Sequence, residues 1–352
     1  MTVQEYHNIL VHSLVNLGDV LLTTSAVALL KKTYPQAKIT MMVRPMAAEI
    51  VENNPVIDEV MIYDYQGQHK PIGKMLAFAN KLRAKKFDVS ISFDRKLRPA
   101  LLCFLAGIPV RVGPDKVFAD KTSWMTKLYT QTITIPHNII NTHQAETYQA
   151  IVRGFTGCQG SMPPVIGTIK AEHKQTAKSL LATLPMSKVR IGLCVKGTFA
   201  LKNWPQERFA QMVDKLAQQY DANFFIIGAP EDKSYATEVI AKANTPIANF
   251  CGQTTLLDLA ALLERIDLFI TVDTGAAHLG AAIGVPMIVI YGCTSPKRWH
   301  PINNRAVVLS TNESCCPCNI PENACPEHRC MQGISVSWVI DEVKKLIVGQ
   351  EE

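Results

Sequence analysis

The sequence predicts an α/β protein with two doubly wound parallel sheets, and three observations lead to this fold class. The chain of 352 residues exceeds the roughly 100–200 residues of a usual single domain. Apolar, strand-like runs alternate with helical patterns almost from end to end. A segment rich in Gly, Pro and Ser at residues 154–168 interrupts this alternation, as a linker would. We therefore expect an N-terminal domain at 1–160, a linker region at 161–184 and a C-terminal domain with a terminal helix at 185–352.

In the N-terminal half, each apolar strand pattern is followed by a helical pattern. Continuous apolar runs are typical of parallel strands that are covered on both faces. We expect strands at residues 8–13, 38–43, 59–64, 87–93 and 109–113. The helices between them are expected at residues 21–33, 46–53, 72–86 and up to about residue 105.

The same order resumes in the C-terminal half, after one further helix. We expect strands at residues 189–195, 222–228, 267–273 and 286–292, with helices at 206–219, at 234–243 and from residue 276. In such folds, ligands bind beyond the carboxyl ends of the strands. The two domains are therefore expected to face a central cleft, with the functional residues on the loops after strands.

Composition narrows the classes of protein and partner. Hydrophobic residues at 47% suffice for two cores, and no apolar run reaches the roughly 20 residues of a membrane span. The first residues lack the basic start of a secretory signal, so we expect a cytoplasmic protein whose ten cysteines are mostly reduced. The net charge of +6 favours an acidic partner. Because no dense Lys/Arg block occurs, an anionic small molecule or a membrane surface fits better than nucleic acid.

The stretch "FITVDTGAAHLGAAIG" indicates an anion site at a strand-to-helix turn. Asp273, Thr274 and Gly275 follow a buried strand, and His278 lies one turn into the next helix. Backbone N–H groups at a helix N-terminus suit a diphosphate. The alternative is a structural helix with Asp273 as its N-cap and a core histidine.

A second loop after a strand carries lysines. Lys196, Gly197, Thr198 and Lys202 precede a helix that Pro205 opens. Lysines at this edge of a sheet could neutralise phosphate groups. Alternatively, both lysines are solvated and the Trp-Pro pair that follows is a packing anchor.

Acidic residues follow the next predicted strand. Glu231 and Asp232 come after "GAP", where a carboxylate can accept hydrogen bonds from ribose hydroxyl groups. Helix capping is the equally plausible alternative. The chain contains no G-x-x-x-x-G-K-[ST] loop, no G-x-G-x-x-G after the first strand and no D-x-D, which argues against an ATPase, an NAD dehydrogenase and a carboxylate pair for a divalent ion. We expect no cofactor.

The cysteines gather near the C-terminus in "CCPCNIPENACPEHRC". Cys315, Cys318, Cys325 and Cys330 form a C-x2-C-x6-C-x4-C pattern that could hold a structural zinc ion. Buried reduced thiols on an irregular loop are the favoured alternative. We assign no metal to the chemistry itself.

Three stretches then carry a family resemblance. "LVNLGDVLLTTSAVALLKKTYPQAKITMMVRP", "LKNWPQERFAQMV" and "VDTGAAHLGAAIGVPMIVIYGCTSPKRWHP" resemble the ADP-heptose:lipopolysaccharide heptosyltransferases of glycosyltransferase family 9. The likeness extends over most of the chain in the same order. It implies a GT-B architecture of two Rossmann-like domains, with an acceptor-binding N-terminal domain and a nucleotide-sugar-binding C-terminal domain. It also implies inverting glycosyl transfer that is independent of metal ions.

The resemblance also implies roles for particular residues. Asp19 matches the aspartate of the family's G-D motif, the candidate base, with Gly18 beside the acceptor. Lys202 matches the lysine of K-x-W-P, a diphosphate ligand that acts in catalysis. The donor-binding residues would be Lys196, Thr198, Glu231 or Asp232, Asp273, Thr274, Gly275 and His278. The loop Lys196-Gly197-Thr198 departs from the hydroxyl residues that often stand there in the family.

An inverting transfer needs one carboxylate to take the proton of the acceptor hydroxyl group. Asp19 at a helix N-terminus would stay ionised and available, although a helix cap is the alternative role. Arg95, Lys96 and Arg98 follow a predicted strand and could meet phosphates or carboxylates of the acceptor, or form a solvated face.

The expected partners are an ADP-heptose donor and a lipopolysaccharide core glycolipid. Such an acceptor would place the enzyme in peripheral contact with the inner face of the bacterial inner membrane. Two alternatives stay open: a relative that uses another nucleotide sugar, such as an N-acetylhexosamine donor, and a nucleotide-sugar-binding protein without catalysis. The intact Gly18-Asp19 pair argues against the second alternative.

Overall fold

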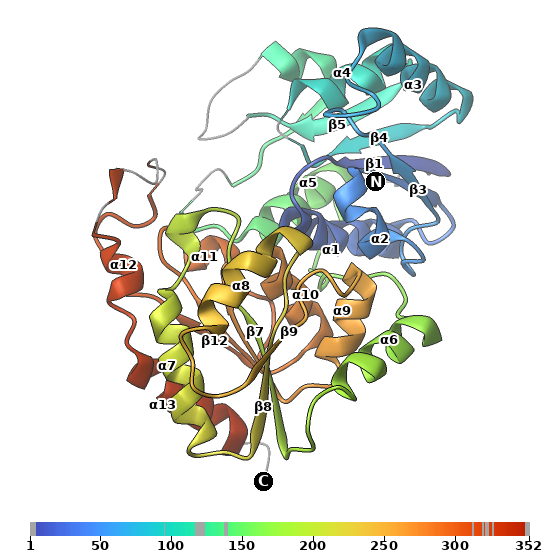
Figure 1. Ribbon diagram of the computed structural model, residues 1–352. Coiled ribbons are helices and arrows are strands. Elements are labelled where there is room, and N and C mark those ends of the chain that lie inside the picture. The colour runs from blue at the N-terminus through green and yellow to red at the C-terminus, as the bar shows by residue number, and fades with distance from the viewer. Residues whose placement is uncertain are drawn as a thin grey trace. The chain divides into compact units, whose positions relative to one another are not determined.

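The computed structural model describes residues 5–94, 96–116, 124–136, 140–311, 313–318, 320, 324–325 and 327–348. The chain divides into two compact units, Met1–Thr168 and Ile169–Glu352. Each unit is built on a six-stranded parallel sheet with helices packed against it (Figure 1). The expected fold class of two doubly wound α/β units is confirmed.

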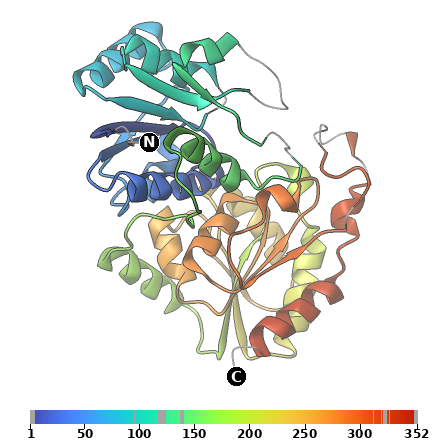
Figure 2. The ribbon, with the colours of Figure 1, turned by 180° about the vertical axis from the view of Figure 1, so that it is seen from behind.

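The sheet of unit 1 has the strand order β3-β2-β1-β4-β5-β6. Its strands are β1 (Asn8–Ser13), β2 (Lys38–Val43), β3 (Glu59–Ile62), β4 (Val89–Ser92), β5 (Val110–Pro114) and β6 (Gln131–Ile133). Its helices are α1 (Leu17–Thr33), α2 (Ala48–Val51), α3 (Ile72–Ala84), α4 (Leu97–Leu105) and α5 (Gln144–Thr156). Figure 2 shows α5 lying beside α1. The chain direction across the sheet reverses between β1 and β4, which is where such folds place a site.

The sheet of unit 2 has the order β12-β11-β10-β7-β8-β9 and reverses between β7 and β10. Its strands are β7 (Val189–Cys194), β8 (Ala222–Ile226), β9 (Ile247–Asn249), β10 (Leu268–Val272), β11 (Met287–Ile290) and β12 (Ala306–Leu309). Its helices are α6 (Ala171–Leu181), α7 (Gln206–Ala217), α8 (Lys233–Ile240), α9 (Leu256–Leu263), α10 (Gly275–Ile283), α11 (Pro296–Trp299), α12 (Arg329–Gln332) and α13 (Val336–Val348). Helix α6 falls within the segment 161–184 that was expected to be a linker region.

Strands β6, β9 and β12 are not among the strands predicted from the sequence. Each has only three or four residues and lies at an edge of its sheet. Strands β6 and β9 have three residues each and no continuous apolar run, and β12 is an apolar run of only four residues, three of them partly exposed. The predicted start of the first helix was also late, because α1 begins at Leu17 rather than near residue 21. The Gly18-Asp19 pair therefore lies inside the first helical turn.

A buried tryptophan anchors the loop after β7 in unit 2. The Trp204 side chain is fully buried, and its Nε1 donates a hydrogen bond of 3.0 Å to the carbonyl oxygen of Ile334. Its ring packs edge-on against Phe209 of α7, at 4.9 Å between ring centroids. A buried aromatic side chain with a bonded N–H holds the adjoining backbone firmly. This anchor positions the preceding residues, which include Lys202.

Candidate active site

The reversal point of the unit 2 sheet is occupied by an ion pair between two predicted site residues. Lys202 Nζ lies 2.7 Å from Asp273 Oδ2, and their side chains are only 13% and 6% exposed. Thr294 Oγ1 donates a second hydrogen bond of 2.7 Å to the same carboxylate oxygen. Lys202 follows β7 and Asp273 follows β10, two neighbouring strands whose carboxyl ends share one edge. The sheet thus brings together a cation and a carboxylate that are distant in sequence.

The loop around Lys202 is closely packed. Lys202 ends a 3₁₀ turn, Ala200–Lys202, and its Nζ lies 5.1 Å from the centre of the Phe199 ring. A Cβ atom on Gly197 would lie only 2.7 Å from the Cβ of Lys202, so a larger residue would displace the lysine. The Gly197 amide also donates to Asn203 Oδ1 at 2.8 Å. This packing explains why a glycine stands at position 197, in a loop where the family often has hydroxyl residues.

A second ion pair lies on the other side of β7. Lys196 Nζ is 2.8 Å from Asp232 Oδ1, and the Ala229 amide donates to Asp232 Oδ2 at 3.0 Å. Asp232 therefore closes the turn after β8 and also holds a lysine, which combines the capping role with a place at the predicted site. The neighbouring Glu231 is exposed.

The turn into α10 differs in one respect from the expectation. Thr274, with an extended backbone, is the N-cap residue, and Gly275 is the first residue of the helix. The alternative of Asp273 as the N-cap is therefore wrong, because its carboxylate is engaged by Lys202. His278 is buried in this helix, whereas Thr198 on the lysine loop is exposed. The first N–H groups of a helix have no partner within it and favour an anion.

The thiols beside these loops are neutral at physiological pH. Burial raises the pKa of Cys194 to about 12. Burial and the nearby Cys318 also raise the pKa of Cys293 to about 12, although Lys202 opposes this shift. The charges at this edge of unit 2 are therefore carried by lysine and aspartate side chains rather than by thiolates.

The four cysteines considered for zinc show no arrangement that supports this site. All ten cysteines of the chain are free thiols. Cys315 is exposed, Cys318 and Cys325 are half-buried, and Cys330 packs in the core. Among the described residues, no group of three or more His, Cys, Asp or Glu side chains is placed to hold a metal ion.

In unit 1, Asp19 lies in the first turn of α1, after the carboxyl end of β1. The hydroxyl group of Tyr148 donates a 2.7 Å hydrogen bond to Asp19 Oδ1. Tyr148 belongs to α5 and is 129 residues away, so no local sequence signal could have revealed it. Such a bond fixes the orientation of the carboxylate. Gly18, beside it, is half-buried.

A buried ion pair supports the loop that leads to Asp19. His12 Nδ1 lies 3.0 Å from Asp94 Oδ2, and both side chains are fully enclosed. The Leu14 amide donates to both oxygens of Asp94, at 2.9 and 3.0 Å. Burial lowers the pKa of His12, but Cys103 and Asp94 raise it to about 10. The imidazolium form is thus held between β1 and β4, and sequence analysis did not identify this pair.

The predicted acceptor residues are only partly brought together. Arg98 donates from Nη1 to the Tyr65 carbonyl and from Nη2 to the Lys70 carbonyl, both at 2.9 Å, so it braces this loop. Lys96 Nζ bonds the Tyr65 hydroxyl group at 3.0 Å, and Arg44 lies 5.3 Å from the centre of the same ring. We call Arg44, Tyr65 and Lys96 the Tyr65 cluster. Arg95 lies outside the described residues.

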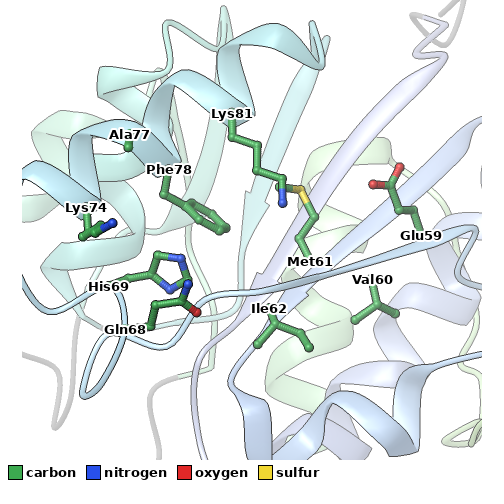
Figure 3. Close-up of a pocket in the computed structure, with 10 residues that line it drawn as sticks. All are labelled: Glu59, Val60, Met61, Ile62, Gln68, His69, Lys74, Ala77, Phe78 and Lys81. Atoms are coloured by element: carbon green, nitrogen blue, oxygen red, sulfur yellow. The ribbon is translucent and has the colours of Figure 1, made fainter.

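A pocket of about 480 Å³ lies elsewhere in unit 1, between β3 and α3 (Figure 3). Its walls include Met61 and Ile62 from the strand and Lys74, Phe78 and Lys81 from the helix. None of the residues predicted from sequence to bind donor or acceptor lines it. The described residues contain no helix that is long and apolar enough to cross a membrane.

Two doubly wound parallel sheets, each with charged side chains at its reversal point, are the architecture found in glycosyltransferases of the GT-B class, and a family 9 structure described below shares it. The sequence model described as "Glycosyltransferase family 9 (heptosyltransferase)" matches residues 75–328, so the chain belongs to this family and is a glycosyltransferase.

Individual relatives agree with this assignment over nearly the whole chain. Lipopolysaccharide heptosyltransferase 2 of Escherichia coli K12 is 24% identical over 95% of this chain and 97% of its own length. The structure of a family 9 glycosyltransferase from Veillonella parvula superposes with a TM-score of 0.85, at 26% identity and with 98% of each chain covered. The structure of E. coli ADP-heptose lps heptosyltransferase II shares the fold, with a TM-score of 0.82 at 21% identity over 98% of this chain and all of the other.

Proposed function

We propose that this enzyme transfers a heptosyl group from ADP-heptose to a lipopolysaccharide core glycolipid, with inversion and without a metal ion. The Lys202–Asp273 pair at the reversal point of unit 2 carries the proposal for the donor. It supplies a fixed cation beside the N-terminus of α10, the combination that a diphosphate requires. The relatives whose names include heptosyltransferase support the choice of sugar.

In this reaction, the acceptor oxygen forms a bond to the anomeric carbon while the bond from that carbon to the ADP oxygen breaks. The proton of the acceptor hydroxyl group passes to the Asp19 carboxylate, which Tyr148 orients. The negative charge that develops on ADP is met by Lys202 and by the first N–H groups of α10. Asp273 acts as a positioning residue, because it holds Lys202 through the ion pair.

The carboxylate of Asp232 is the proposed partner of the ribose hydroxyl groups. Lys196 forms an ion pair with this carboxylate and so neutralises its charge. Glu231 is the less suitable candidate, because its side chain is exposed and Asp232 is the residue held beside Lys196. For the acceptor, we propose that the Tyr65 cluster meets an anionic group of the core glycan, since Arg44 and Lys96 present two cations around one aromatic ring. Because such an acceptor is anchored in lipid, we propose that the enzyme acts at the cytoplasmic face of the inner membrane.

Incubation with a panel of nucleotide sugars and a truncated, water-soluble core acceptor tests this function. Mass spectrometry should detect a heptosyl adduct with ADP-heptose, and anomer-sensitive NMR should show the inverted linkage. A product formed only from an N-acetylhexosamine donor would replace the proposed substrate. Binding of nucleotide sugars without any product would indicate a non-catalytic protein.

A further inference from the structure

Helix α3 of unit 1 presents an outward face that the proposed chemistry does not use. Ile72 and Leu76, one helical turn apart, are 70% and 44% exposed. The opposite side of the same helix is buried in the core of unit 1 through Met75, Phe78 and Leu82. We call the exposed residues Ile72, Lys74, Leu76 and Lys81 the α3 face.

The charge around this face is strongly one-sided. Residues 70–86 contain six Lys or Arg residues and no Asp or Glu, in a chain whose net charge is +6. On the helical wheel, Ile72 and Leu76 fall on one flank of the exposed surface, and Lys74 and Lys81 fall on the other. Gly73, Ala77, Ala84 and the polar Asn80, all exposed, lie between the two flanks.

The two lysines of this face, Lys74 and Lys81, also line the pocket beside α3. In Figure 3, Lys74 and Lys81 extend from α3 around the pocket, opposite Met61 and Ile62 of β3. The one carboxylate among the residues that line it, Glu59, is already paired with Lys85 and with Lys38, the latter at 2.9 Å. The pocket therefore offers two lysine ammonium groups without a free carboxylate beside them, in a lining that mixes polar residues with Met61 and Phe78.

We propose that the α3 face docks unit 1 onto an anionic phospholipid surface, with the lipid phosphates against Lys74 and Lys81. A helix surface that exposes aliphatic side chains on one flank and lysines on the other is compatible with lying in an anionic membrane interface. A protein partner fits less well, since lysine is depleted at protein interfaces. Helix α4 continues the surface, because Arg83 of α3 bonds the Leu105 carbonyl at 2.6 Å and the neighbouring Phe104 is 49% exposed.

The position of α3 relates this surface to the proposed acceptor site within unit 1. The loop that leads into α3 is the one that Arg98 braces through the Tyr65 and Lys70 carbonyl groups. A membrane below α3 would therefore lie next to the Tyr65 cluster. The inference rests on the proposed function in this respect: the acceptor is taken to be a glycan anchored in that membrane.

Sedimentation of the full chain with vesicles tests the proposal. We expect binding to vesicles of phosphatidylglycerol and phosphatidylcholine, weaker binding at high salt, and little binding to pure phosphatidylcholine. The Lys74→Gln/Lys81→Gln variant should bind the anionic vesicles about 25-fold more weakly, at about fivefold for each charge. The Ile72→Ser/Leu76→Ser variant should lose about tenfold. The matched control, Lys174→Gln/Lys178→Gln on the exposed surface of α6, should bind as the wild type does.

Thermal unfolding of each variant checks that it folds, and transfer to a truncated water-soluble acceptor should proceed at the wild-type rate in all of them. Equal binding of the wild type to neutral and anionic vesicles, or unchanged binding by both α3 variants, would overturn the docking surface. A dimer that dissociates in the Ile72→Ser/Leu76→Ser variant would instead assign the face to a second copy of the chain. Absence of heptosyl transfer to the soluble acceptor by the wild type would count against the proposed function alone.

Discussion

The Lys202 ammonium group and the Asp273 carboxylate form a 2.7 Å ion pair at the reversal point of the unit 2 sheet. The sequence predicts both residues to contact the donor. In the structure, however, the carboxylate accepts hydrogen bonds from Lys202 and from the Thr294 hydroxyl group. The pair gives Lys202 a fixed direction while leaving its three N–H donors able to divide between Asp273 and a phosphate. We therefore propose that Asp273 serves the donor only indirectly, by holding Lys202.

Removal of the lysine should weaken donor binding. For Lys202→Ala, we expect ADP affinity to fall about ten- to a hundredfold, because a charge-assisted contact with phosphate contributes about 1.5–3 kcal/mol. Transfer should also slow, since charge on the diphosphate grows as the glycosidic bond breaks. Isothermal calorimetry with ADP and steady-state kinetics measure the two effects.

The paired variant Lys202→Ala/Asp273→Asn separates binding from folding. Lys202→Ala alone leaves a buried carboxylate without its cation, which lowers the free energy of unfolding. The double variant should regain most of that stability and remain defective in ADP binding. Wild-type ADP affinity in either variant would show that Lys202 does not touch the diphosphate, and Lys196 would become the better candidate.

Loss of the proposed base should affect turnover and leave nucleotide binding intact. For Asp19→Asn, we expect kcat to fall by about 10²–10⁴, the usual effect of removing a general base. ADP affinity should stay unchanged, since Asp19 belongs to unit 1. The exposed Glu52→Gln variant of the same unit is the matched control and should turn over normally. A fully active Asp19→Asn enzyme would show that Asp19 is not the base and has only a structural role in the first turn of α1.

The hydroxyl group of Tyr148 should matter for catalysis through Asp19. For Tyr148→Phe, we expect kcat to fall about tenfold, because a hydrogen bond to a charged group is worth about 1.5–3 kcal/mol and part of it is replaced by water. In the Asp19→Asn background, the same substitution should have little further effect. Independent, additive losses in the double variant would contradict the positioning role. Tyr220→Phe in unit 2 serves as the control.

The His12–Asp94 pair should make stability depend on alkaline pH. The pKa of His12 rises from 6.5 to about 10 in the folded chain, so its contribution is complete below pH 6.5 and is lost as the pH rises through 10. The stability difference between the wild type and Asp94→Asn, measured by urea unfolding, should therefore shrink between pH 6.5 and 10. A constant difference over this range would show that the imidazole is neutral.

Asp58→Asn provides the control for this pH series. Burial raises the pKa of Asp58, but the Ile39 amide and Lys31 lower it below its ordinary value. Such a carboxylate contributes stability above its unfolded pKa and loses it only as the pH falls through the folded pKa. The difference between the wild type and Asp58→Asn should thus stay level from pH 6.5 to 10.

Transfer activity should persist in the presence of EDTA. The sequence contains no D-x-D motif, and Lys202 supplies a positive charge where the leaving diphosphate is proposed to lie. Initial rates with and without the chelator, measured on one enzyme preparation, decide the point. Loss of activity that added magnesium restores would refute the metal-independent reaction.

Much of the fold could be predicted from local patterns. Continuous apolar runs predicted the inner strands, because a strand buried on both faces must be apolar throughout. Turn and helix-start residues placed the candidate loops at the carboxyl ends of those strands. The short edge strands, such as β6 and β9, could not be predicted, since an edge strand needs neither a long run nor two buried faces.

The sequence by itself determined which residues stand at the carboxyl ends of strands, including Asp19, Lys202 and Asp273, because strand and helix periods are local properties. Only the tertiary structure decided which of them meet. The pairing of Lys202 with Asp273 depends on β7 lying beside β10. The bond from Tyr148 to Asp19 depends on α5 packing against α1 across 129 residues. Strand order and helix packing arise from burying the core of each unit as a whole, and no local pattern encodes them.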